Sequence, residues 1–139
     1  TRDAYTAESA RALPVFVKIA PDLNDADLDD VVLAVDAARI DGIIATNTTV
    51  RRNGLPARYA DLKGGLSGVP LRALSTEIVR KLAARTGGRL PIIGVGGIDG
   101  PAAALEKLDA GATLVQIYSG MVYAGPGLAR EIGRGLMNG

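Results

Sequence analysis

The stretch "LPIIGVGGIDGPAAALEKLDAGATLVQI", residues 90–117, is the part of the sequence that decides the fold. Its apolar run over 90–95 predicts a buried strand, and its alanine-rich segment 101–111 predicts a helix with a proline in the first turn and a glycine past the end. A second apolar run, 113–117, predicts another strand. A helix between two such strands is typical of parallel pairing through a right-handed crossover, so the stretch predicts an α/β fold.

The same alternation runs through the rest of the chain. Apolar runs predict two earlier strands, and apolar residues at helical spacing predict three more helices: strands 14–20 and 42–46, helices 24–40, 71–88 and 127–137. Four strand–helix units fit two architectures, an open doubly wound sheet or four βα units of a (β/α)8 barrel. A complete barrel needs about 250 residues, and this chain has 139, so it can hold at most half of one.

Composition narrows the chemistry that the chain can carry. Hydrophobic residues make up 47% of it and aromatics only 4%, which is typical of parallel sheets with Val, Ile and Leu cores. The net charge of +1 gives no indication of a nucleic-acid partner. The chain contains no cysteine and no histidine, so disulfides, thiolate chemistry and a histidine base are excluded within it. No apolar run is long enough to span a membrane.

Polar groups or glycines lie near the carboxyl end of each of the four predicted strands. In both architectures ligands bind at the carboxyl ends of the strands, so these groups should meet at one edge of the sheet. They are Lys18 in the first strand, Thr46, Asn47, Thr48 and Thr49 after the second, Gly96 and Gly97 after the third, and Tyr118, Ser119 and Gly120 after the fourth. A cation, amide and hydroxyl groups and a glycine pair at one edge predict a polar binding site.

The glycine pair Gly96–Gly97 lies between a predicted strand and the helix 101–111. Exposed N–H groups there, with a helix dipole behind them, favour phosphate, and a side chain would hold the anion away. The alternative is a tight turn without a ligand. The surrounding "GVGGIDG" (94–100) is not the dinucleotide fingerprint, because no matching acidic residue ends the following strand.

Other motifs also have a simple structural alternative. Lys18 could be a strand-end charge that reaches solvent, but it interrupts an apolar run, which favours a site. "TNTT" (46–49) could be an ordinary turn. The irregular stretch 47–70 is long enough to be functional, although its "KGGLSG" (63–68) could be a lid without ligand contacts. The acidic segment 22–30 could be a metal cluster; we interpret it as a solvated helix N-terminus and expect no metal site.

Five motifs in this order resemble a known family: "VFVKIAPDL", "IIATNTT", "GGLSGVPL", "IIGVGGI" and "GATLVQIYSGMVYAGPGL". They are similar to the second half of a dihydroorotate dehydrogenase, and "KIAPDL" with the "YSG…Y.GP" ending is closest to the quinone-linked class. The resemblance implies that residues 14–139 are the C-terminal half of an FMN-binding (β/α)8 barrel, with 1–13 as the tail of a preceding helix or linker. It implies FMN-dependent oxidation of dihydroorotate to orotate with a quinone acceptor, in pyrimidine (UMP) biosynthesis.

The resemblance also implies roles for ten residues. Lys18 resembles the lysine beside the flavin ring, where an ammonium would stabilise the negative charge at flavin N1 on reduction. The other cofactor contacts would be Thr46, Ser67 and Gly68, with a phosphate cradle made of Gly96, Gly97, Tyr118 and Ser119. Asn47 and Thr48 resemble the residues that bind dihydroorotate and orotate.

The family's first barrel half has no counterpart among these motifs. It carries the serine that acts as base, and Ser67, Ser75 and Ser119 do not match that motif, so no catalytic residue is assigned here. The quinone class also has an N-terminal helical pair, which implies peripheral contact with the cytoplasmic side of the inner membrane. Two alternatives stay open: an isolated half-barrel that binds phosphate or FMN without turnover, and another phosphate-binding barrel enzyme. A lone half would expose two sheet edges, which predicts dimerisation or aggregation.

Overall fold

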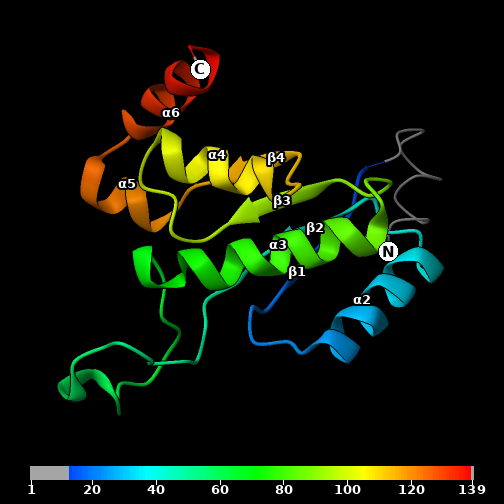
Figure 1. The fold of residues 1–139 in the computed structure, drawn as a ribbon, viewed down its shortest axis with the longest axis horizontal. Helices are drawn as coiled ribbons and strands as arrows, with labels where there is room; N and C mark the ends of the chain where they lie inside the picture. The colour runs from blue at the N-terminus through cyan, green and yellow to red at the C-terminus, as the bar shows by residue number, and fades with distance from the viewer. Residues whose placement is uncertain (1–12, 139) are drawn as a thin grey trace.

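The computed structural model describes residues 13–138, so all of the predicted N-terminal tail except Leu13 lies outside the described part. Four short strands form one parallel sheet in the order β1-β2-β3-β4 (Figure 1). The strands are β1 (Phe16–Ile19), β2 (Gly42–Ala45), β3 (Ile92–Val95) and β4 (Leu114–Gln116). The helices are α2 (Asp25–Ala37), α3 (Arg72–Thr86), α4 (Pro101–Asp109), α5 (Ser119–Ala124) and α6 (Leu128–Met137), with two 3₁₀ turns, η1 (Ala57–Tyr59) and η2 (Val69–Leu71).

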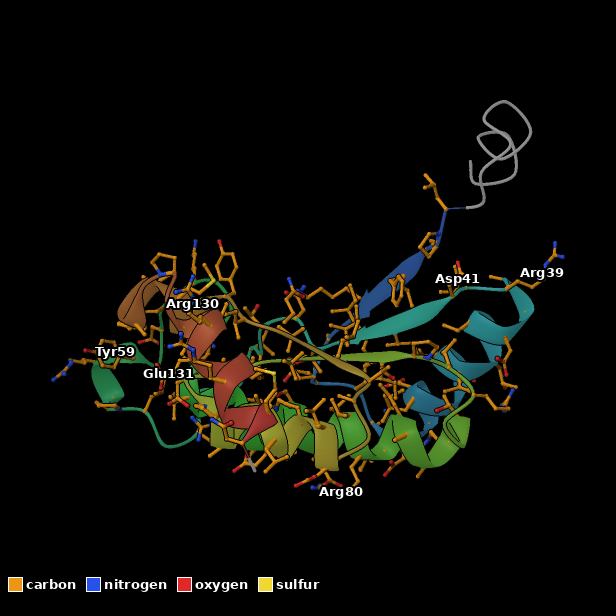
Figure 2. All side chains as sticks on the ribbon, turned by 90° about the horizontal axis from the view of Figure 1, so that it is seen from above. Arg39, Asp41, Tyr59, Arg80, Arg130 and Glu131 are labelled. Atoms are coloured by element: carbon orange, nitrogen blue, oxygen red, sulfur yellow. The ribbon has the colours of Figure 1, made fainter. Side chains whose placement is uncertain are left out.

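The strand order decides between the two predicted architectures. Right-handed crossovers between strands that follow one another in the same direction place every helix on one face of the sheet. A doubly wound sheet reverses its strand order and carries helices on both faces. Here the order never reverses, and α3 and α4 lie together on one side of the sheet (Figure 2). The predicted α/β fold of four consecutive βα units of the barrel type is confirmed, and the open doubly wound alternative is wrong.

The two faces of the sheet differ sharply in burial. The face toward the helices carries Ile19, Ile43 and Ile92, which are buried with α2 and α3 residues in the main hydrophobic cluster. The opposite face carries a cross-strand row that starts at Lys18 and ends at Leu114. Leu114 is 59% exposed. The helix-covered face therefore supplies most of the hydrophobic stabilisation, at roughly 25 cal/mol per Å² of apolar area buried.

The acidic segment before and within α2 is only partly the solvated helix start that we expected. Asn24 and Asp27 do form a capping box at the N-terminus of α2. Asp25, however, pairs with Lys81 and Arg85 of α3 at 3.0 Å each. Hydrogen bonds from Lys81 and then Arg85 lower the pKa of Asp25. The segment therefore also fixes α2 against α3.

Two local expectations are wrong. Between the predicted strand 113–117 and the predicted helix 127–137 no helix was predicted, but this segment contains α5, which is followed by Gly125 with φ +76°. The helix predicted over 24–40 is shorter in the structure, because α2 ends at Ala37 and exposed Ala38 is its C-cap. Among residues 13–138, no helix has the length and apolar content that crossing a membrane requires.

Candidate functional site

A cavity of about 220 Å³ lies at the carboxyl ends of the four strands. All ten residues to which the resemblance gives roles line it: Lys18, Thr46, Asn47, Thr48, Ser67, Gly68, Gly96, Gly97, Tyr118 and Ser119. Of the other two groups predicted at the strand ends, Gly120 lines the cavity and Thr49 does not. The structure thus brings together groups that are up to a hundred positions apart in sequence. Five further lining residues were missed: Leu71, Val95, Ile98, Gln116 and Ile117. Val95, Gln116 and Ile117 lie at, or one position from, the ends of the predicted strands 90–95 and 113–117, so including those positions would have found three of the five.

The loop after β3 has a backbone orientation suited to an anion. Arg72 Nε donates to the carbonyl of Gly97 at 2.8 Å, and Ser75 Oγ donates toward the carbonyl of Gly96 at 3.2 Å. The C=O and N–H of a trans peptide point in opposite directions. Because both carbonyls face α3, the N–H groups of Gly97 and Ile98 face away from it. Neither N–H donates to a backbone acceptor within residues 13–138, and such adjacent amides form an anion-binding concavity.

The reason for glycine at these two positions differs from the one we expected. We expected a side chain to obstruct the anion, but an added Cβ would point toward α3 instead. At Gly97 it would lie 2.8 Å from Arg72 Cα and 2.9 Å from Arg72 N; at Gly96 it would lie 2.7 Å from Ser75 Oγ. Both residues also have positive φ, +122° and +71°. The glycines therefore allow the loop to approach the start of α3 closely.

The segment after β2 presents its polar groups in an ordered way. Thr46 is 1% exposed and donates through Oγ1 to the carbonyl of Asn47 at 2.9 Å. Asn47 N donates to Ile19 O at 2.7 Å, and Asn47 Oδ1 accepts from Thr48 N at 3.0 Å. Because its side-chain oxygen is occupied, exposed Asn47 can offer a ligand chiefly its NH₂ donors.

The long loop between β2 and α3 is tied back at both of its ends. Thr49 and Leu66 form an antiparallel bridge with N···O distances of 3.1 and 2.8 Å. Ser119 Oγ donates to Ser67 Oγ at 2.9 Å, which joins the loop to α5. Between these ties the loop and η1 extend away from the sheet (Figure 1), and Tyr59 marks the extended end (Figure 2).

Asp22 anchors the first of these ties, a role that the sequence analysis missed. Its carboxylate accepts from Thr49 Oγ1 at 2.6 Å and from Val50 N at 3.1 Å, and it pairs with Arg51 at 3.3 Å. We had interpreted Asp22 as part of a solvated helix start, which is wrong. Hydrogen bonds to a charged acceptor are stronger than neutral ones, so this carboxylate fixes where the loop leaves the site.

Lys18 reaches the cavity from β1, on the face of the sheet that the helices leave open. It is exposed within the described residues. A second lysine, Lys107 of α4, is fully buried at 0% exposure, and no motif pointed to it. Ala103, Ala104 and Lys107 share the buried stripe of α4 at helical spacing. A cation on an otherwise small, apolar stripe is the signal that could have found it.

No group of three or more Asp, Glu, His or Cys side chains within residues 13–138 is arranged to hold a metal ion. The polar groups that line the cavity are amides, hydroxyls and the ammonium of Lys18, which can bind a ligand through hydrogen bonds and charge.

The comparison with known families agrees with this geometry. The family model described as dihydroorotate dehydrogenase matches residues 3–138. The chain belongs to the dihydroorotate dehydrogenase family.

The resemblance inferred from the five motifs is confirmed. The dihydroorotate dehydrogenase (quinone) of Rhizobium leguminosarum bv. trifolii is 52% identical over 136 residues, which cover 97% of this chain and 38% of the relative. That of Edwardsiella ictaluri is 56% identical over 126 residues, covering 88% and 37%. The crystal structure of DHODH from Eimeria tenella in complex with ferulenol superposes with a TM-score of 0.86 at 40% identity, covering 92% of this chain and 34% of that one. The chain thus spans little more than a third of the length of these relatives.

Proposed function

We propose that this chain forms the cofactor-binding wall of a quinone-dependent dihydroorotate dehydrogenase. The proposed reaction is the oxidation of dihydroorotate to orotate with FMN as cofactor and a quinone as acceptor, in the synthesis of pyrimidines and UMP. The observation that carries the proposal is the cavity in which all ten motif residues meet. The names of relatives at 52% and 56% identity give independent support.

The groups that line the cavity are of the kinds that FMN would need. The glycine loop, with its amides turned away from α3, fits the phosphate, and Tyr118 and Ser119 border the same space. Thr46, Ser67 and Gly68 would contact the flavin, and Lys18 would lie beside its ring. Bound FMN would supply the two-electron acceptor that no side chain of this chain can provide.

The chain's own residues would bind and orient. The Lys18 ammonium would stabilise negative charge on the ring system. The Asn47 amide and the Thr48 hydroxyl, both exposed at the end of β2, would hold the carboxylate and ring of the substrate in place. The base that removes a proton would come from residues outside this chain, as would the quinone site and the peripheral contact with the cytoplasmic side of the inner membrane.

Anaerobic mixing of the full-length protein with dihydroorotate tests the proposal. We expect the absorbance of bound FMN to bleach as the flavin is reduced, and a quinone to restore it. Full-length protein that binds FMN but never bleaches would contradict the proposed reaction and leave the second candidate function, binding of phosphate or FMN without turnover. Protein that binds no flavin at all would contradict both candidates.

Lys18→Ala tests the assignment of the ring-side cation. We expect this variant to bind FMN but to reduce it slower by about two orders of magnitude or more, because about 3 kcal/mol of charge stabilisation is lost. Lys81→Ala removes an equal charge from α3, where Lys81 pairs with Asp25, and should reduce flavin at the normal rate. Equal single-turnover rates for the two variants would contradict the role of Lys18.

A further inference from the structure

Lys107 lies behind the glycine loop rather than in the cavity. Its side chain is 0% exposed. Its ammonium donates to the carbonyl of Arg72 at 3.0 Å, to Ser75 Oγ at 2.6 Å and to Thr76 Oγ1. An ammonium has three N–H donors, so all three are used. All three acceptors are uncharged, and all lie in the first turns of α3.

A buried ammonium without a charged partner is unusual, because desolvation disfavours the charged form. Burial is the main cause that lowers the pKa of Lys107 to about 8; nearby Glu106 opposes this effect and Arg72 adds to it. Glu106 is exposed, and none of the three hydrogen bonds of the ammonium goes to its carboxylate. At neutral pH the chain keeps a positive charge inside at a cost in stability.

A short hydrogen-bonded path connects this charge to the cavity. Lys107 donates to Ser75 Oγ, and Ser75 Oγ in turn lies 3.2 Å from the carbonyl of Gly96. Because Lys107 occupies the hydroxyl oxygen as an acceptor, the one hydroxyl hydrogen is directed away from Lys107, toward the two carbonyls that lie 3.2 Å from Oγ, those of Gly96 and Arg72. The Arg72 carbonyl already accepts from Lys107 and from Thr76 Oγ1, so the Gly96 carbonyl is the acceptor with fewer competing donors. Holding the Gly96 carbonyl toward α3 keeps the N–H of Gly97 on the opposite side. Lys107 thereby acts on the loop through one intervening side chain.

We propose that Lys107 is a positioning residue for the anion-binding loop and the buried cation that favours a phosphate dianion there. It orients Ser75 and, through it, the peptide between Gly96 and Gly97. Its charge lies just behind the amides that would contact the anion, in a region where interior charges are weakly screened. This inference rests on the proposed function, because the phosphate is that of FMN.

The test compares two flavins that differ only in the phosphate. FMN and riboflavin are titrated into the FMN-free full-length protein, and binding is followed by quenching of flavin fluorescence. Lys107→Met removes the charge and nearly preserves the volume, and Lys107→Gln removes the charge but keeps a donor. Ser75 and Thr76 can still donate to Arg72 O in both variants, so neither hydroxyl loses every partner. Lys81→Met on α3 is the charge-matched control.

We expect Lys107→Met and Lys107→Gln to weaken FMN binding by about tenfold or more while riboflavin binding changes by less than about twofold. The control should leave both affinities unchanged. Equal weakening of both flavins, or normal FMN affinity in the Lys107→Gln variant, would overturn the role of Lys107. Unaltered protein that binds FMN no more tightly than riboflavin would overturn the phosphate site itself, and with it the proposed function. Should Lys107→Met fail to fold, the Lys107→Gln variant alone decides.

Discussion

Lys107 should give the protein an unusual dependence of stability on pH. Burial lowers the pKa of this lysine from its ordinary 10.5 to about 8. Below pH 8 it is protonated in both the folded and unfolded states, so the full cost of burying the charge is present. Between about pH 8 and 10.5 the unfolded state binds the extra proton, so the free energy of unfolding rises with pH. The lowering of the Lys107 pKa corresponds to a free energy of unfolding that is about 3 kcal/mol larger at alkaline pH than below pH 8.

Urea unfolding of the FMN-free full-length protein at several pH values from about 7 to about 10 measures this rise. Other groups titrate in the same range, so Lys107→Met is measured in parallel, and the difference between the two proteins isolates the lysine. We expect the free energy of unfolding of the unaltered protein to rise, relative to that of the variant, by about 2–3 kcal/mol between about pH 7 and about pH 10. A difference that stays constant with pH would refute the reasoning that the ammonium is desolvated. Bound FMN should diminish the rise, because a nearby anion raises the pKa of a lysine.

Three further predictions concern the loops and the sheet edges. Gly97→Ala should destabilise the protein by roughly 1–3 kcal/mol more than Gly88→Ala in thermal unfolding. The two glycines share a positive φ (+71° and +75°), but only at Gly97 would the new Cβ meet α3. Equal decreases in the melting temperature of the two variants would contradict this reasoning. Asp22→Ala should speed proteolytic cleavage of the loop after β2, since three interactions of its carboxylate are lost. The control Asp30→Ala removes the same charge from an exposed position of α2 and should leave the cleavage rate unchanged. An unchanged cleavage rate in the Asp22→Ala variant would argue against Asp22 as the anchor of the loop. The 139-residue chain expressed alone should dimerise or aggregate through the edges of β1 and β4, and a monodisperse monomer by light scattering would contradict that.

Much of the fold could be predicted from local patterns. Each strand lies inside a predicted apolar run, because buried parallel strands need continuous apolar residues and have breakers at their ends. The helix α5 could not be predicted in this way. It is six residues long and begins against the β3–α4 loop, where a Cβ on Gly120 would lie 2.3 Å from Ile98 O. Its packing is set by a contact between distant segments, and no periodicity over six residues signals that.

The candidate site followed from one topological rule, that parallel strands present their carboxyl ends at one edge. That rule, with the motifs, located Lys18, Asn47 and the glycine pair at one cavity. It could not locate Asp22 or Lys107, because each acts on partners 27 or more positions away. Such pairings depend on the packing of one helix or loop on another, which single-sequence patterns do not encode. The same holds for the glycine pair, whose close neighbours are in α3.

The cavity occupies only one end of the sheet, so the opposite end can carry a chemical label without altering the site. The turns that lead from helices into strands lie at the other end, where Figure 2 shows Arg39 and Asp41 far from Tyr59. Arg89, in the turn between α3 and β3, has a 67% exposed side chain and only a 3.7 Å pairing with Asp36. Because the chain contains no cysteine, Arg89→Cys would introduce its single thiol. A fluorophore attached there would report flavin occupancy through energy transfer while leaving every group that lines the cavity untouched.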